Sequence, residues 1–255
     1  PVKTRDVRIE DSVAIGASDA GIYVGQSRDV IVRNSRAEFN VAGIEIENTV
    51  NADVYGNTAT NNTGGILVFN MPALSQQGGA VRVFKNKVFK NNTDNFGAKG
   101  TPVASVPAGS GVVINSNDDI EIFDNDIADN KTANIIVSSV YSTGYKDDKA
   151  SGEFDPYPER IHVHGNRLSG GGDSPDRLDF KTLKVAMYGL NGSFPDVLFD
   201  GYVNPQRKEG PQICLRDVSG VLNADGPGGN KSPSKDAKPY DCSLPSLPAI
   251  DLKRG

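Results

Sequence analysis

Short runs of alternating apolar and polar residues recur along the chain at a nearly constant spacing. A quartet made of glycine, an aliphatic residue, a variable residue and a second aliphatic residue begins at Gly21, Gly43 and Gly65, so its spacing is 22 residues. The quartet returns at Gly111 and, with the glycine replaced, at Asn134. Alternation with a period of two is typical of β-strands. A strand that recurs in this way predicts an all-β solenoid in which each repeat is one coil.

A second aliphatic anchor follows the quartets at Gly21, Gly43 and Gly111 by eleven residues and predicts a second strand in the coil. Equivalent anchors occur at Val83 and Val163, where the intervening loops are longer. Stacked coils then give three inward-facing columns of mostly β-branched residues, which suit stacked strands. The first column contains Ile22, Ile44, Ile66, Val112 and Ile135. The second contains Val24, Ile46, Val68, Ile114 and Val137. The third contains Val32, Val54, Val83, Ile122 and Val163.

Asparagine recurs shortly after the second anchor in two sets. One set is Asn57, Asn86, Asn125 and Asn166, and the other is Asn40, Asn62, Asn91 and Asn130. We expect these residues to occupy turns that need the left-handed backbone conformation. We also expect their amides to form hydrogen-bonded rows from coil to coil.

The composition agrees with a turn-rich β protein and excludes several classes. The 255 residues include 28 glycines and 15 prolines, both of which disfavour helix. The net charge of −5 comes without a basic cluster, which argues against nucleic acid as a partner. No apolar run reaches 18 residues, so no membrane span is expected. Two histidines and two cysteines leave little material for a metal centre, and we expect neither a metal nor another cofactor.

The repeat predicts a β-helix over residues 1–203 and an irregular C-terminal cap over residues 204–255. The second segment loses the period, gains proline, glycine and serine, and contains both Cys214 and Cys242. A disulfide between them would stabilise the cap and indicate an oxidising compartment, whereas two free thiols are the alternative. Pro1 and Val2 fall at the end of a predicted strand, so we expect further coils to precede them.

Three segments, residues 21–27, 43–48 and 161–166, carry a resemblance to a known family. They resemble the secreted bacterial parallel β-helix repeat-containing proteins, members of the pectate-lyase-like superfold, and the likeness extends over about residues 1–203. This resemblance implies a right-handed parallel β-helix and an extracytoplasmic location, whether secreted, periplasmic or at the cell surface. It implies no particular activity, because the superfold includes lyases, hydrolases, epimerases and non-catalytic surface proteins.

Insertions into the repeat predict a groove over the first-strand face. The insertions are residues 71–80, 93–110, 139–159 and 169–184. They fall at both edges of that face, where elaborated loops commonly carry function. The outward positions between them give the expected ligand-binding residues, Tyr23, Glu45, Glu47, Phe69, Asn70 and Asn115.

Glu45 and Glu47 are the candidate catalytic residues. They lie two residues apart on one side of a strand, with roughly 7 Å between their Cα atoms. Carboxylates at such a separation serve as acid and base on glycosidic bonds. A cation-binding pair and a merely solvated pair are the alternatives, so whether the protein is an enzyme stays open.

The outward columns lack the residue sets of the best-known enzymes of the superfold. They show neither the aspartates and basic residue typical of pectate lyases nor the aspartates and histidine typical of polygalacturonases. Residues 155–160 come nearest to the motif of mannuronan epimerases but lack its histidine, and we interpret that similarity as coincidence.

The second-strand face carries a different pattern. One outward column contains Tyr55, Phe84, Phe123 and His164, and its neighbour contains Asp53, Arg82, Glu121 and His162. We interpret both as ladders that stabilise the stacked strands, with a platform for sugar rings as the alternative. His162 and His164 share this face and could bind a metal, but no cysteine or acidic partner on that face lies nearby in sequence.

Two functions therefore remain open. In the first, an exported β-helix protein binds, and in one version also modifies, a polysaccharide in the groove. In the second, it is a non-catalytic scaffold whose partner is an envelope or extracellular protein. The superfold and the paired insertions favour the first, whereas the missing enzyme motifs and the absence of tryptophan favour the second.

Overall fold

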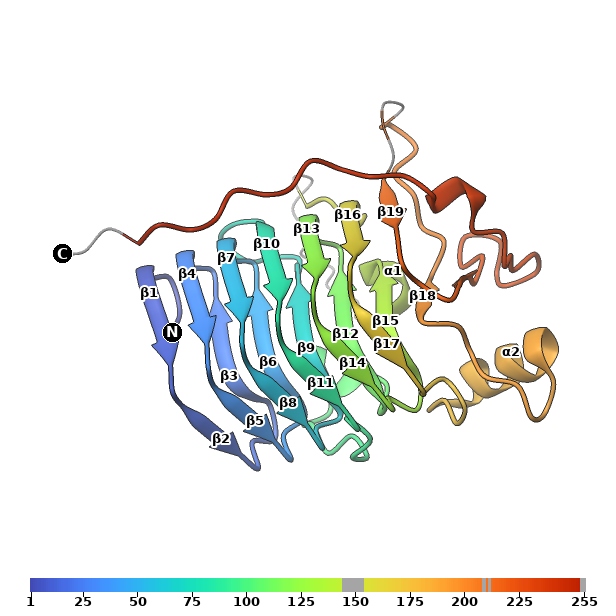
Figure 1. The fold of residues 1–255 in the computed structure, drawn as a ribbon, viewed down its shortest axis with the longest axis horizontal. Coiled ribbons are helices and arrows are strands. Elements are labelled where there is room, and N and C mark those ends of the chain that lie inside the picture. Colours follow the sequence, from blue (N-terminus) through green and yellow to red (C-terminus); the bar gives the residue numbers. More distant parts are fainter. Residues whose placement is uncertain (144–153, 208–209, 211, 253–255) are drawn as a thin grey trace.

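The computed structural model describes residues 1–143, 154–207, 210 and 212–252, and they form a parallel β-helix of three sheets (Figure 1). Sheet A contains β3 (Ala20–Gly25), β6 (Ala42–Glu47), β9 (Gly64–Phe69), β12 (Ser110–Asn115), β15 (Ala133–Ser138), β18 (Val197–Phe199) and β20 (Val221–Asn223). Sheet B contains β1 (Arg5–Glu10), β4 (Arg28–Arg33), β7 (Val50–Tyr55), β10 (Gly79–Phe84), β13 (Asp118–Phe123), β16 (Glu159–His164) and β19 (Ile213–Leu215). Sheet C contains β2 (Val13–Ile15), β5 (Arg36–Glu38), β8 (Thr58–Thr60), β11 (Lys87–Phe89), β14 (Asp126–Ala128) and β17 (Arg167–Ser169).

Each coil passes from sheet A to sheet B to sheet C and back to sheet A. From β3 to β6 the connections contain two, two and three residues, which accounts for the 22-residue period. The strands of one coil pair in parallel with those of the next, so Ile22 lies opposite Ile44 and Val32 lies opposite Val54. All three predicted columns are buried in one hydrophobic core inside the coils, which confirms the predicted solenoid and its register.

The asparagines form the predicted rows at two corners of the coil. At the corner between sheets B and C, the Asn57 side-chain amide donates to Asn86 Oδ1 at 3.0 Å, and that of Asn86 donates to Asn125 Oδ1 at 3.0 Å. At the corner between sheets C and A, Asn62 Nδ2 donates to Asn91 Oδ1 at 2.9 Å. These buried amides satisfy one another and the backbone of the neighbouring coils.

The turns at these corners contain the expected left-handed conformation, but the row asparagines themselves do not adopt it. The positive φ belongs to the residue before each asparagine, as at Lys85 before Asn86 (φ 53°) and Asp124 before Asn125 (φ 53°). Because the preceding residue makes the turn, the asparagine side chain points into the corner, where it reaches the next coil.

The glycine that begins each quartet allows close packing between coils. A Cβ on Gly43 would lie 2.5 Å from the carbonyl oxygen of Gly65 and 2.7 Å from Asn62 Nδ2. No larger residue fits beneath the asparagine row without moving the backbone, which explains the repeated glycine.

The insertions lie at the two edges of sheet A, as the broken period predicts. Two insertions connect sheet C to sheet A. The first is residues 90–109, which contain the short helix η1 (Pro102–Ser105), and the second is residues 170–196, which contain α2 (Leu178–Tyr188). Residues 70–78 and the segment beginning with α1 (Val140–Thr143) connect sheet A to sheet B. Residues 144–153 of the predicted 139–159 insertion lie outside the described residues.

Strand pairing continues beyond residue 203, because β19 and β20 extend sheets B and A. After β20 comes the short helix η2 (Lys238–Tyr240), and then residues 243–252, here named the strap, run back along sheet B toward the first coils (Figure 1). The predicted disulfide is confirmed: Cys214 in β19 is bonded to Cys242, just before the strap, with 4.8 Å between their Cα atoms. Such a bond persists in oxidising compartments.

Candidate functional site

The outer face of sheet A is covered by a second apolar layer rather than open to solvent. Leu67, Val113 and Ile136, which form one of the outward columns, are buried at 0%, 4% and 7% exposure. They pack in a hydrophobic cluster with Val106 and Leu198, to which the insertions contribute. A ligand can therefore reach this face of the sheet only where the second layer is incomplete.

Glu45 and Glu47 are also buried on this face, and they lie next to each other and to Tyr23. Their exposed fractions are 2% and 8%, and the Tyr23 hydroxyl donates to Glu47 Oε1 at 2.6 Å. Burial raises the pKa of Glu45 well above its usual 4.5, and the neighbouring Glu47 raises it further. Glu45 Oε2 has no hydrogen-bond partner among the described residues. The structure thus favours a protonated Glu45.

The other predicted ligand-binding residues divide into two groups. Asn70 is 1% exposed, and its Oδ1 accepts the backbone N–H of Gly78 at 2.6 Å, so it holds the insertion at that corner. Phe69 and Asn115 line a pocket farther along sheet A, and Tyr23, Glu45 and Glu47 lie outside its lining.

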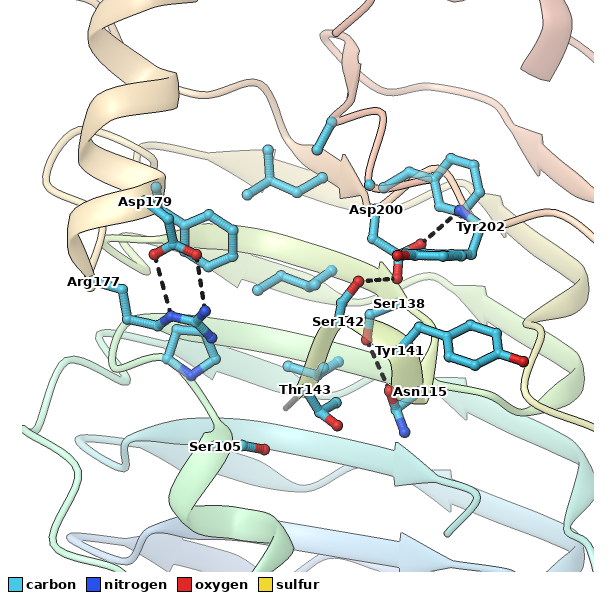
Figure 2. A pocket seen from close by; sticks show the side chains of 18 of the residues that line it. Ser105, Asn115, Ser138, Tyr141, Ser142, Thr143, Arg177, Asp179, Asp200 and Tyr202 are labelled. Carbon is cyan, nitrogen blue, oxygen red and sulfur yellow. Dashed lines mark hydrogen bonds and ion pairs between the residues drawn. The ribbon is translucent and has the colours of Figure 1, made fainter. Parts of the chain in front are cut away.

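The pocket has a volume of about 260 Å³ and lies over the later strands of sheet A (Figure 2). Its floor is Phe69, Val113, Asn115, Ile136, Ser138 and Leu198. One wall combines Ser105 at the end of η1 with residues at the start of α2, where Arg177 and Asp179 form an ion pair at 2.8 Å. The insertions at the edge of sheet A therefore supply one side of the pocket and the strands supply its base.

The opposite wall is aromatic. Tyr141 in α1 and Tyr202 after β18 have ring centroids 5.2 Å apart. Both residues line the pocket, and Figure 2 shows them on the side away from Arg177. Tyr141 also packs edge-on against Tyr157 at 5.9 Å.

Asp200 holds this aromatic wall in place. Its Oδ2 accepts hydrogen bonds from the Ser139 backbone and the Ser142 hydroxyl, both at 2.6 Å, and its Oδ1 accepts the Tyr202 backbone N–H at 3.1 Å (Figure 2). Burial raises the pKa of Asp200 to about 6, and these three hydrogen bonds oppose the rise. Because both oxygens already accept protein donors, Asp200 acts as a positioning residue for the wall.

The floor places a few polar groups among apolar ones. Ser138 Oγ donates to Asn115 Oδ1 at 3.2 Å, and Asn115 Nδ2 donates weakly to the Asn70 carbonyl at 3.4 Å. An apolar surface with an amide, hydroxyls and tyrosine rings suits a ligand that has both ring faces and hydroxyl groups.

The outer face of sheet B is occupied by the strap. The predicted aromatic ladder is confirmed, with stacked rings 4.8 Å apart at Tyr55 and Phe84 and 4.9 Å apart at Phe84 and Phe123. In the neighbouring column Arg82 pairs with Asp53 at 2.9 Å. The strap backbone donates from Leu247 to Glu121 Oε2 at 3.0 Å, so it lies across this column.

Sequence reasoning located the face of the pocket but missed several of its residues. Tyr141 and Tyr202 lie in segments that have no repeat period, so no register assigns them to a face. Residues 155–160, the string closest to the epimerase motif, do not line this pocket. Glu159 and Arg160 from that string instead make ion pairs around the start of β16.

The three stacked parallel sheets define a right-handed parallel β-helix protein, and residues 2–74 match a family described as right handed beta helix region. Among solved structures, the chain is similar to the A-modules of two mannuronan C-5 epimerases of Azotobacter vinelandii, AlgE4 and AlgE6. Each is 18% identical, with TM-scores of 0.44 and 0.46 over 77% and 78% of this chain. The chain spans 53% and 50% of those two chains, about half their length. No curated protein matches the sequence. No helix in the described part of the chain is long and apolar enough to cross a membrane.

Proposed function

We propose that this protein binds a carbohydrate in the pocket over β9, β12, β15 and β18, outside the cytoplasm. The observation that carries the proposal is the pairing of the Tyr141 and Tyr202 wall with the polar atoms of Asn115 and Ser138 on the floor. Aromatic rings pack against the apolar faces of sugar rings, and amide and hydroxyl groups bond to their hydroxyls. The disulfide supports the extracytoplasmic location.

The size of the pocket limits the ligand that it takes. Its volume of about 260 Å³ is close to the lower end of the range for small-molecule sites, roughly 300–1,000 Å³. A single sugar unit or the end of a chain fits this volume better than an extended stretch of polysaccharide. Arg177 at the rim, although paired with Asp179, offers a cationic group to an acidic sugar.

We assign a supporting role to Glu45 and Glu47, the two carboxylates that the sequence marks as candidate catalytic residues. Glu45 and Glu47 lie outside the lining of the pocket. The register of sheet A places them beside Leu67 and Phe69 on the same face, and we infer that they support the floor from the side. The contribution of Tyr23, Glu45, Glu47 and Asn70 to ligand binding stays a prediction, and whether the protein is an enzyme stays open.

A glycan panel that contains neutral and acidic oligosaccharides tests the proposal directly. We expect binding by the parent protein and at least a tenfold weaker association for Tyr202→Ala and Tyr141→Ala, since each removes part of the aromatic wall. Phe39→Ala is the matched control, because Phe39 is an exposed aromatic residue at the end of β5, outside the pocket lining.

Three outcomes separate the alternatives. Loss of binding in the tyrosine variants but not in Phe39→Ala supports the pocket. Equal loss in Glu45→Gln or Glu47→Gln would return those carboxylates to the binding surface. Absence of binding to every glycan would overturn the carbohydrate proposal and leave the scaffold alternative.

A further inference from the structure

Both histidines of the chain and one glutamate converge on the outer face of sheet B. The parallel register of β13 and β16 places Glu121 opposite His162, and His164 lies two residues farther along the same strand, with its side chain on the same face. One ligand atom from each of these three side chains lies within 4.8 Å of the others. Glu121 is thus an acidic partner that comes from 41 positions earlier in the sequence than His162.

His162 is the unusual member of this group. It is 7% exposed, yet neither of its ring nitrogens has a hydrogen-bond partner among the described residues. Its neighbours are paired: Glu121 Oε1 contacts His164 Nε2 at 3.0 Å, and Glu121 Oε2 accepts the Leu247 N–H at 3.0 Å. A buried imidazole without a partner is costly, so it indicates a group that is still to be bound.

We propose that Glu121, His162 and His164 bind a divalent transition-metal ion, with Zn²⁺ as the preferred ion. Two imidazoles and one carboxylate form a donor set that zinc favours, whereas Ca²⁺ and Mg²⁺ prefer oxygen ligands alone. A point equidistant from three atoms 4.8 Å apart lies about 2.8 Å from each, so closing to zinc–ligand distances of roughly 2.0–2.2 Å needs shifts of less than about 1 Å. A fourth position is left for water or for a backbone group of the strap.

The second group of ligand-type side chains found in the described residues does not share these properties. Asp118, Asp155 and Glu159 also lie close together. However, Arg160 is paired with Asp118 and Glu159, and Arg207 is paired with Glu159. Arginines therefore already pair with two of the three carboxylates in this cluster.

The position of the proposed metal connects two coils and the strap. Glu121 comes from β13 and the histidines come from β16, so a bound ion would join adjacent coils. The second oxygen of Glu121 holds the strap through Leu247. We therefore expect metal binding to raise the thermal midpoint of the protein and to slow proteolysis of the strap.

Titration of the complete, tag-free protein with Zn²⁺ alone tests this site. Because the chain has two histidines and both lie here, every imidazole signal in an NMR spectrum reports on the site. We expect one equivalent of Zn²⁺ to bind with a dissociation constant below about 10 μM and to shift the ring signals of both histidines. Co²⁺ should give visible absorption bands typical of nitrogen and oxygen ligands.

The variants are chosen so that a folding failure does not decide the outcome. His164→Gln changes a partly exposed side chain, and we expect it, like His162→Gln and Glu121→Gln, to weaken Zn²⁺ binding by more than about tenfold. Asp126→Asn is the matched control, a carboxylate on β14 paired with Arg167 at the surface, and it should bind like the parent. If His162→Gln does not fold, the Zn²⁺ affinity of His164→Gln and the NMR ring signals of the parent protein still test the proposed site. No stoichiometric binding, unmoved ring signals, or unchanged affinity in His164→Gln would each overturn the proposal.

Discussion

Removing one amide from an asparagine row should destabilise the solenoid far more than removing an asparagine at its surface. Asn86 is 1% exposed, and its Oδ1 accepts both the backbone N–H and the side-chain amide of Asn57 at 3.0 Å. Its own amide donates to the Val54 carbonyl at 2.9 Å and to Asn125 Oδ1 at 3.0 Å. Asn86→Ala removes all four hydrogen bonds but keeps the backbone bond from residue 86 to Asn125.

The size of the effect follows from the groups left behind. The Asn57 N–H, one proton of the Asn57 amide and the Val54 carbonyl lose these partners in a buried corner. Each buried polar group left unpaired costs about 1–3 kcal/mol, so three such groups should lower the free energy of unfolding by about 3–9 kcal/mol. That is a large part of the roughly 5–15 kcal/mol available to a typical domain.

Urea unfolding followed by far-UV circular dichroism measures this difference. Asn92→Ala is the matched control, because Asn92 lies at the same kind of corner but its two side-chain hydrogen bonds are at the surface. We expect it to cost less than about 1 kcal/mol. Equal urea midpoints for Asn86→Ala and Asn92→Ala would refute the idea that the buried rows stabilise the coils.

Three further predictions concern buried carboxyl groups and the strap. Because the pKa of Glu45 is raised in the folded protein, its carboxyl group contributes full stability below pH 4.5, and this contribution is lost as pH rises. Glu45→Gln keeps no titrating group at this position, so it should become more stable than the parent as pH increases from 5 to 8. Thermal melts across this pH range measure the difference. The pKa of Asp200 is raised from 3.8 to about 6, so the parent should lose about 3 kcal/mol of stability between about pH 4 and pH 6, and Asp200→Asn should not show this slope in urea titrations. Deleting residues 244–252 removes the hydrogen bonds of the strap to Glu121 and Asp53, so it should lower the thermal midpoint. An unchanged midpoint would show that the strap adds no stability.

The repeat in the sequence was sufficient to predict the architecture, because each coil contacts mainly its neighbours. A fixed period places equivalent residues directly above one another, so the inward columns around Ile44 and Val54 and the amide rows could be read without a structure. The same regularity showed that the insertions flank sheet A. Because the chain contains only two cysteines, the sequence allows a single intramolecular disulfide, Cys214–Cys242, which the structure contains.

Where the period ends, the sequence carries no register, and the tertiary structure decides. Tertiary packing buries Glu45 and Glu47, although alternation alone marks both as outward-facing. Tyr141 and Tyr202 reach one wall through loops whose path no repeat fixes. Stacking of coils brings Glu121 to His162 across 41 positions of sequence, and the strap crosses this column because the disulfide fixes its start beside β19. Local periodicity determines which way a strand faces, but what covers that face depends on contacts between segments far apart in the chain.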